Sequence, residues 1–351
     1  MSLNNPYILL QISLNANDPV IARSLMQVSK SFNKYVNTTA FGILFKRYGR
    51  HNYEYQARRG CLRAIKWLHH HNHIKGCTKW AMDLAACNGH LDIVKWLHKN
   101  RKEGCTTRAM DWAAWNDHLD VVKLLHKNRK EGCTIDAMDL AAKNGRLDVV
   151  KWLHIHRKEG CTKWAMDWAA CNGHLEVVKW LHKNRKEGCT KRASIFASES
   201  GHLEIVKWLY TNRTESFTKR AMGFAALNGH LEIIKWLHEK TKNCGTNVMS
   251  LAAQYGHLDI VKWLHTHCKE GCTTDAMDWA AKNGHIDVVK WLHENRKEGC
   301  TIKAMAFAAR NGHLDVVKWL HENRDEGCAK SAMVRAAKYG HVEIVKWLRE
   351  N

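Results

Sequence analysis

One segment recurs along this chain every 28 residues, as from Gly145 to Gly173, and this period constrains the fold more than any other feature. The segment reads Gly-His-Leu-Asp-Ile-Val-Lys-Trp-Leu-His, and about eleven copies of the repeat fill most of the 351 residues. Its glycine stands at Gly89, Gly145, Gly173, Gly201, Gly229, Gly256, Gly284, Gly312 and Gly340. Asp117 takes this place once, and Gly60 begins a degenerate first copy. A fixed period of about 20 to 50 residues indicates stacked units that each need a neighbour to bury an apolar face. We therefore expect a long binding surface and no pocket.

Each repeat predicts two short helices joined by a turn. In one copy, Thr134 offers its hydroxyl to the free amides of a helix that begins at Ile135. Gly145 supplies the left-handed residue that ends this helix, and a second helix runs from Leu147 to about Ile155. The apolar face of the first helix consists of Ala137, Met138, Ala141 and Ala142. Because these side chains are mostly small, we expect the second helix to pack close to the first.

The second helix of nearly every copy begins with an acidic residue and ends with basic residues. The acids are Asp92, Asp120, Asp148, Glu176, Glu204, Glu232, Asp259, Asp287, Asp315 and Glu343. In one copy the bases are Lys99, Arg101 and Lys102. This arrangement complements the helix macrodipole in each copy, so we interpret it as a folding signal and not as an active site.

A tryptophan recurs in the second helix. It stands at Trp67, Trp96, Trp152, Trp180, Trp208, Trp236, Trp263, Trp291, Trp319 and Trp347. Large aromatic side chains at a fixed place in an apolar helix predict core positions. The exception is Leu124, in the copy that also has Asp117 for glycine and an extra Trp115. We expect this copy to be the least regular.

These repeats resemble the ankyrin repeat over about residues 52–351. The pattern Gly-Cys-Thr-x-x-Ala-Met-Asp-x-Ala-Ala-x-Asn-Gly-His-Leu-Asp-Val-Val-Lys-Trp-Leu is similar to the family's Gly-x-Thr-Pro-Leu-His-x-Ala-Ala followed by Gly-His and a Leu-Leu helix. Two features differ from the family: Ala137, Met138 and Asp139 replace Pro-Leu-His, and the period is shorter than the usual value of about 33 residues. The resemblance implies an all-α, ankyrin-type α-solenoid of about eleven helix-turn-helix repeats with shortened hairpin loops. Short repeats of this kind look most like those abundant in large DNA viruses of protists.

Residues 1–50 lie outside the period and carry six Lys or Arg against one acid, Asp18. They predict short helices with too little core to fold alone. The segment resembles an F-box through Pro6, Ile8, Leu9, Ile12, Leu25, Val28 and Phe32, whereas Asn5 and Ala22 depart from that pattern. This resemblance implies contact with the linker subunit of a cullin-type ubiquitin ligase. The alternative is a helical cap on the repeat array, and in both cases the predicted domains are 1–50 and 51–351.

The sequence gives no sign of catalytic, metal or cofactor chemistry. The 24 histidines mostly follow the repeat, and no His-Glu-x-x-His segment occurs. The 13 cysteines include no Cys-x-x-Cys pair, and free cysteines indicate a reducing compartment. No apolar run approaches the roughly 18 residues of a membrane helix. We therefore expect a soluble, non-enzymatic, intracellular protein without cofactor, in the cytoplasm or nucleus, of a host cell if the chain is viral.

The residues that vary between copies at the start of the first helix are candidates for binding. This helix start lines the concave side in ankyrin-like stacks, and the candidates are Lys79, Trp80, Arg108, Lys163, Trp164, Lys191, Arg192, Lys219, Arg220 and Lys303. Tryptophans among cations are typical of interface hot spots, and a net charge of +21 favours an acidic partner. Ordinary variation of an exposed first turn would give the same pattern.

These observations favour a monomeric recognition protein that binds one acidic protein, with a ubiquitin-ligase link if the first segment is an F-box. A scaffold without that link is one alternative. A basic nucleic-acid binder is another, although the chain carries no recognised nucleic-acid-reading motif.

One copy is shorter than the others. The spacing from Gly229 to Gly256 is 27 residues, and the segment from Asn243 to Thr246 replaces the usual Glu-Gly-Cys-Thr turn. We expect both neighbouring helices to be intact and the tilt between adjacent repeats to change at this point.

Overall fold

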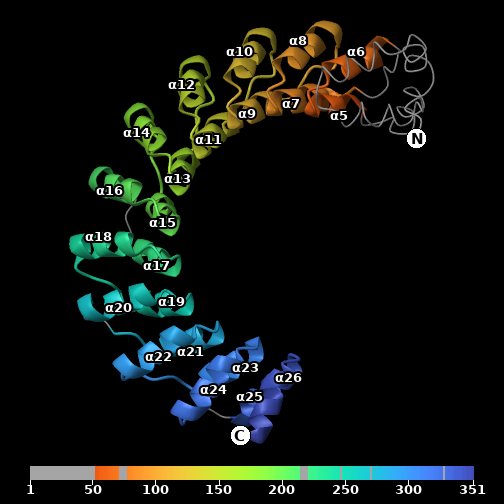
Figure 1. The fold of residues 1–351 in the computed structure, drawn as a ribbon. Coiled ribbons are helices and arrows are strands. Elements are labelled where there is room, and N and C mark those ends of the chain that lie inside the picture. Colours follow the sequence, from red (N-terminus) through yellow and green to blue (C-terminus); the bar gives the residue numbers. More distant parts are fainter. Residues whose placement is uncertain (1–51, 71–76, 214–219, 246, 269–270, 327–328) are drawn as a thin grey trace, which may run out of the picture. The chain divides into compact units, whose positions relative to one another are not determined.

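The computed structural model describes residues 52–70, 77–213, 220–245, 247–268, 271–326 and 329–351. Within these residues every regular element is an α-helix, which confirms the predicted all-α class. Within each compact unit of the chain, the helices alternate between an odd-numbered and an even-numbered row (Figure 1). Among the described helices, none combines the length and the apolar character that crossing a membrane would require.

The odd-numbered helices are the first helices of the repeats: α5 (Asn52–Arg58), α7 (Lys79–Cys87), α9 (Thr107–Trp115), α11 (Asp136–Lys143), α13 (Lys163–Cys171), α15 (Arg192–Glu199), α17 (Arg220–Leu227), α19 (Val248–Gln254), α21 (Asp275–Lys282), α23 (Lys303–Asn311) and α25 (Ala329–Lys338). The even-numbered helices are the second helices: α6 (Leu62–His70), α8 (Leu91–Asn100), α10 (Leu119–Asn128), α12 (Leu147–His156), α14 (Leu175–Asn184), α16 (Leu203–Asn212), α18 (Leu231–Thr241), α20 (Leu258–His267), α22 (Ile286–Asn295), α24 (Leu314–Asn323) and α26 (Val342–Glu350). The predicted start of α12 at Leu147 is confirmed, and its end lies one residue beyond the predicted Ile155.

The chain divides into two compact units. Of the described residues, the first unit holds those up to 133 except 114–117, and the second holds 114–117 and those from 134 to 351. Within the second unit each odd-numbered helix packs on the next odd-numbered helix and on the even-numbered helix that follows it in the chain. Figure 1 shows the odd-numbered helices on the inner side of this unit's curve. Within the first unit, α5 packs on α6 and α7, and α7 packs on α8.

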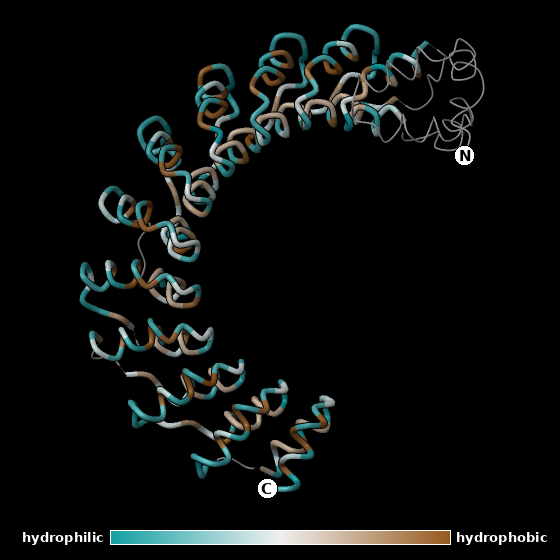
Figure 2. Tube along the Cα trace, in the orientation of Figure 1, coloured by the Kyte–Doolittle hydropathy of each residue, from teal (hydrophilic) through white to brown (hydrophobic). Residues whose placement is uncertain are grey.

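The core of each repeat lies between its two helices. In α12 the side chains of Val149, Val150 and Leu153 are buried, and in α11 Ala141 and Ala142 are buried. The hydrophobic colour in Figure 2 accordingly recurs in every repeat, while the outer ends of the even-numbered helices are mostly hydrophilic. Small alanines on the first helix allow the close packing that the sequence predicted.

The recurring tryptophans are not core residues, and the prediction from sequence was wrong on this point. Trp208 is half-buried, whereas the adjacent Leu209 is 0% exposed. The Trp208 ring meets the His182 ring of the preceding repeat edge to face, with centroids 5.1 Å apart. The same contact joins His69 to Trp96, His154 to Trp180, His238 to Trp263, His265 to Trp291, His293 to Trp319 and His321 to Trp347. The tryptophans therefore link adjacent repeats along the edge of the core.

The Gly-His pair that recurs in most repeats has a structural role. Gly173 has a φ of +82°, and a Cβ at this position would lie 2.7 Å from Cε1 of His202 in the next repeat. The Nε2 atom of His202 lies 3.1 Å from the carbonyl oxygen of Cys171, in the preceding repeat. This glycine therefore provides both the left-handed turn and the space for the next histidine, which supports the structural interpretation of the histidines.

A buried aspartate in one repeat binds the threonine that starts the next. The Thr162 hydroxyl accepts a hydrogen bond from the Trp164 amide, so it caps α13, and the same hydroxyl donates to Asp139. The equivalent pairs are Asp83 with Thr106, Asp167 with Thr190, and Asp278 with Thr301. Burial raises the pKa of the Asp139 carboxyl, and the hydrogen bonds from Thr162 oppose that shift. The Ala-Met-Asp departure from the ankyrin pattern thus provides a contact between repeats.

The two unusual copies depart from the regular repeat in different ways. In the copy with Asp117, this residue takes the left-handed conformation of the missing glycine, with a φ of 69°, and α9 and α10 are both complete. The shortened copy differs in its backbone, because Lys242 is left-handed and α19 spans only 7 residues. The division between the two compact units falls within the Asp117 copy, at residues 114–117, so its predicted irregularity stays a prediction. Both neighbouring helices of the shortened copy are present as predicted.

Candidate functional site

The predicted binding residues lie at the starts of odd-numbered helices. Lys79 and Trp80 begin α7, Arg108 lies in the first turn of α9, Lys163 and Trp164 begin α13, Lys191 and Arg192 begin α15, Arg220 begins α17 and Lys303 begins α23. We call these nine residues the first-turn surface; Lys79, Trp80 and Arg108 belong to the first unit, and the other six belong to the second. Trp164 is half-buried and the others are exposed. Helices α13, α15, α17 and α23 belong to the row on the inner side of the second unit's curve (Figure 1). The tenth predicted residue, Lys219, lies outside the described residues.

In the first unit, Arg108 stacks on tryptophans from two repeats. Its Cζ atom lies 5.1 Å from the ring centroid of Trp80, in the preceding repeat, and 5.8 Å from that of Trp112. The two indole rings are 5.8 Å apart. Such cation–π contacts hold the guanidinium plane over an aromatic face and leave its N–H edge available for a carboxylate. Trp80 is nevertheless 41% exposed, so a partner can reach it.

The second unit repeats this relationship. The Arg192 guanidinium lies over the Trp164 ring of the preceding repeat, with Cζ 4.8 Å from the centroid. Trp164 in turn contacts Trp168, one helical turn further along α13, at a centroid distance of 5.1 Å. The Lys143 ammonium lies 5.1 Å from the centroid of the Trp168 ring. Both predicted tryptophans are therefore paired with a cation from the next repeat.

The first-turn charges of the second unit are grouped by sign. The first turns of α13, α15 and α17 present Lys163, Lys191, Arg192 and Arg220, all of them exposed. Acidic residues take the equivalent place on helices before and after these three. Asp136 begins α11, and Asp275 begins α21. The described cations on α13 to α17 thus form a positive stretch with an acid on each side, which suits a partner of limited length.

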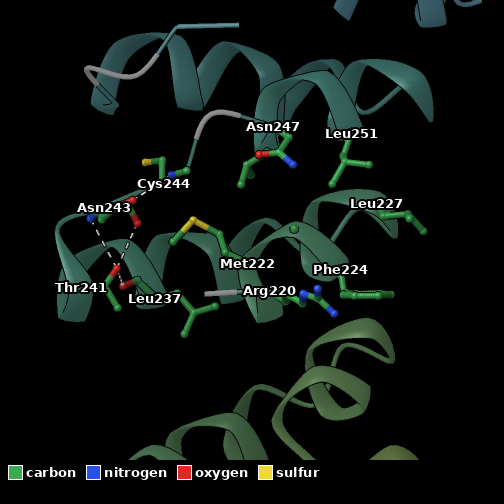
Figure 3. Close-up of a pocket in the computed structure, with 13 residues that line it drawn as sticks. Arg220, Met222, Phe224, Leu227, Leu237, Thr241, Asn243, Cys244, Asn247 and Leu251 are labelled. Carbon is green, nitrogen blue, oxygen red and sulfur yellow. Dashed lines mark hydrogen bonds between the residues drawn. The ribbon is translucent and has the colours of Figure 1, made fainter. Parts of the chain in front are cut away.

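A cavity of about 870 Å³ lies beside this stretch, and its lining includes Arg220 (Figure 3). Met222, Leu227 and Leu251 contribute apolar walls from α17 and α19. Gly223 occupies the position that holds the buried aspartate in the regular repeats, so no side chain from this position fills the space between α17 and α19. The sequence-based expectation of a surface without a pocket is therefore wrong at this repeat.

The basic loops after the even-numbered helices are partly neutralised by their own acids. Arg185 donates from Nε to Glu187 over 3.2 Å, and Nη2 of Arg185 donates to the same carboxylate. Equivalent ion pairs occur at residues 101–103, 129–131, 157–159, 296–298 and 324–326. Partial burial alone would raise the pKa of Glu131, but hydrogen bonds from Arg129 and from backbone amides outweigh it and lower that pKa to about 2. The loop arginines are therefore engaged within the fold, while Lys183 and Lys186 are exposed.

Three residues of the aromatic clusters were missed in the sequence. Trp112 and Trp168 each lie four residues after a first-turn candidate, Arg108 and Trp164 respectively. Residues four apart on a helix are neighbours, so this spacing was a usable signal. Lys143 offers no such signal, because it ends the first helix of the preceding repeat and reaches Trp168 only through stacking of the repeats.

The shortened copy brings together three side chains of the kind that bind metals, although the sequence predicted no metal site. Cys244 and Cys268 are joined by a disulfide, with Cα atoms 6.1 Å apart, contrary to the expectation of free cysteines. Nδ1 of His238 lies 3.2 Å from Sγ of Cys244. The two cysteines are 24 residues apart and belong to adjacent repeats, so no short sequence motif indicates this cluster.

The F-box-like contacts Pro6, Ile8, Leu9, Ile12, Leu25, Val28 and Phe32 lie outside the described residues. The predicted boundary between 1–50 and 51–351 lies there too, so both stay predictions.

A family model described as ankyrin repeats, in three copies, matches the chain at residues 54–139, 138–221, 221–304 and 277–351. These overlapping matches cover all but the first 53 residues. A search of curated proteins found no match to the chain.

Proposed function

Because the chain belongs to the ankyrin-repeat family of protein–protein interaction scaffolds, we propose that it recognises an acidic protein through the first-turn surface. Ankyrin-repeat proteins are generally interaction modules without enzymatic activity. In this proposal Trp80 and Trp164 are the anchors, and the surrounding lysines and arginines bind carboxylates of the partner.

One observation carries the proposal: each anchor tryptophan is stacked against an arginine from the next repeat. Arg108 lies 5.1 Å from the Trp80 centroid, and Arg192 lies 4.8 Å from the Trp164 centroid. Stacking restrains two long side chains before binding, which reduces the entropy lost when a partner immobilises them. A stacked guanidinium still offers paired N–H donors that match a carboxylate. Aromatic and arginine side chains are also the residues that most often dominate interface energies.

The experiment is affinity capture with the full chain as bait, compared with a Trp80→Ala/Trp164→Ala double variant. Trp115→Ala is the matched control, because Trp115 is an exposed tryptophan at the end of α9 and not in a first turn. An acidic protein enriched by the wild type and by Trp115→Ala, but not by the double variant, supports the proposal. Equal enrichment by all three proteins contradicts it.

The ligase link is a finer part of the proposal, and it depends on the F-box-like pattern in residues 1–50. Leu9 and Val28 are the apolar residues of that pattern whose replacement by aspartate would most oppose burial at an interface. We expect the full chain to co-purify with the linker subunit of a cullin-type ligase. Leu9→Asp with Val28→Asp should abolish this without changing the unfolding of the repeats. Co-purification that survives the double substitution, or none with the wild type, leaves an ankyrin scaffold without the link.

The nucleic-acid alternative rests on the net charge of +21. The loop ion pairs weigh against it, because they engage arginines that would otherwise be available to neutralise phosphates. The salt dependence of binding, discussed below, separates the two partner classes.

A further inference from the structure

In regular repeats an arginine, a histidine and a cysteine from adjacent repeats meet beside the loops. Nη1 of Arg185 lies 3.3 Å from Nδ1 of His154, and the same guanidinium hydrogen-bonds the thiol of Cys161. The arginine–histidine contact recurs between Arg213 and His182, Arg296 and His265, and Arg324 and His293. The arginine is always the residue that directly follows the second helix of the later repeat.

The shortened copy has the same three positions with one replacement. His238 and Cys244 are the histidine and cysteine, and Cys268 directly follows α20, where the other repeats have arginine. The replacement removes a fixed positive charge and adds a second sulfur atom. The ligand atoms of these three side chains all lie within 4.8 Å of one another. Cys244 is 4% exposed, and the other two are half-buried.

We propose that His238, Cys244 and Cys268 form a zinc site when the two cysteines are reduced. Zinc favours thiolate and imidazole ligands, with Zn–S distances of about 2.3 Å and Zn–N distances of about 2.0 to 2.1 Å. Tetrahedral binding would place the two sulfurs about 3.8 Å apart, which follows from those bond lengths. The Cα separation of 6.1 Å allows this after the disulfide opens, because only the side chains need to rotate. Three protein ligands leave the fourth position to water.

The histidine is already oriented for this role. Its ring meets the Trp263 ring edge to face, with centroids 5.4 Å apart, and this contact fixes the plane of the imidazole. Nδ1 points to Cys244 at 3.2 Å. Thiolate and imidazole donors also select zinc over magnesium and calcium, which prefer oxygen ligands.

Zinc binding and the disulfide exclude each other, because both use the same two sulfur atoms. Opening the disulfide requires two electrons, which a small thiol supplies: two R–SH molecules are oxidised to R–S–S–R, and two cysteine thiols form. Zinc then displaces the two thiol protons, which are released to solvent. In both states the site links the loop after α18 to the end of α20. The disulfide makes this link in the oxidised form, and the zinc ion makes it in the reduced form.

The test uses the full chain, reduced with a phosphine under inert gas and titrated with Co²⁺ as a spectroscopic substitute for zinc. We expect one equivalent of Co²⁺ to give the thiolate charge-transfer and tetrahedral d–d bands, and Zn²⁺ to displace it. The untreated disulfide form should give neither band. Absence of these bands in the reduced wild type would overturn the proposal.

The decisive variant is Cys268→Arg. It restores the arginine, histidine and cysteine found together in the regular repeats, so the array should stay folded. It should weaken metal binding by more than about 100-fold, since loss of even an outer-shell partner of a ligand costs about 10- to 100-fold. The matched control is Cys272→Ser, which alters a cysteine that belongs to a regular trio with Arg296 and His265. If Cys268→Arg unfolds at a lower temperature than the wild type, Cys268→Ser provides a second test of Cys268 as a metal ligand. Unchanged cobalt bands in either Cys268 variant, or their loss in the Cys272 control, would overturn the assignment.

Discussion

Asp139 in one repeat accepts two hydrogen bonds from Thr162 at the start of the next. The Thr162 amide donates to Oδ1 over 2.8 Å, and its hydroxyl donates to Oδ2 over 2.6 Å. At one junction both ends of this pair are replaced, by Ala306 and Ala329. At other junctions only the aspartate is replaced and the threonine stays, as with Gly223 and Thr246 or Ser250 and Thr273. The aspartate at this place therefore occurs only where its threonine is present, because a buried carboxylate without its donors would be costly.

Asp139→Ala should lower the free energy of unfolding by at least about 2 kcal/mol, because hydrogen bonds to charged groups contribute about 1.5 to 3 kcal/mol each. Chemical denaturation monitored by circular dichroism measures this. Asp148→Ala is the control, since its carboxylate is exposed at the start of α12, and it should have a much smaller effect. Equal losses in the two variants would show that the link between repeats contributes little.

Leu209→Ala should destabilise the array more than Trp208→Ala, although tryptophan is the larger side chain. Leu209 is fully buried, and removing such a leucine costs about 2 to 5 kcal/mol. Trp208 is half-buried, so its loss removes part of an apolar surface and one aromatic contact worth about 0.5 to 1.5 kcal/mol. We expect about 1 to 3 kcal/mol for Trp208→Ala. Chemical denaturation of both variants measures the loss of unfolding free energy. A larger loss in Trp208→Ala than in Leu209→Ala would indicate that the tryptophans are core residues.

Acid should weaken the array through the loop carboxylates. Hydrogen bonds from Arg129 and backbone amides overcome the effect of burial and lower the pKa of Glu131 from 4.5 to about 2. A lowered folded-state pKa contributes stability that is present above the ordinary pKa and is lost as the pH falls through the folded value. Chemical denaturation between pH 6 and pH 2 should therefore show the wild type losing its advantage over Glu131→Gln. A difference that stays constant over that range would contradict the prediction.

The buried aspartates oppose this trend. Burial raises the pKa of Asp83, Asp139, Asp167 and Asp278, and the threonine hydrogen bonds offset only part of the shift. A raised folded-state pKa means that stability from these groups is present at low pH and is lost as the pH rises through the folded value. The comparison with Glu131→Gln cancels this contribution, because both proteins keep all four aspartates.

Trp80→Ala and Trp164→Ala should each weaken binding of the protein partner by more than about 1 kcal/mol, since buried aromatic anchors dominate interfaces. Lys183→Glu with Lys186→Glu should have little effect, because these exposed lysines lie in a loop and not on the first-turn surface. Isothermal titration calorimetry at two salt concentrations measures both. A nucleic-acid partner would instead be favoured if the tryptophan variants bound with unchanged affinity, if the loop-lysine variant bound much more weakly, and if affinity fell steeply with salt concentration.

The helices and their order follow from local patterns of residues. Gly173 predicts a left-handed helix end because the adjacent residues and its own missing side chain decide that conformation. Thr162 predicts a helix start for the same local reason, and its hydroxyl does cap α13. The first-turn position of Trp164 follows from its place two residues after that cap. These features depend on contacts within a few residues, which a periodic sequence displays directly.

The contacts between side chains of different repeats depend instead on how the repeats stack. Whether Leu209 or Trp208 enters the core depends on how α16 is rotated against its neighbours, because both are apolar and adjacent in the chain. Arg192 stacks on Trp164, and Cys268 reaches Cys244, only because successive repeats stack in a fixed register. Contacts between residues more than 20 positions apart are set by packing geometry, and the local pattern of residues does not encode that geometry.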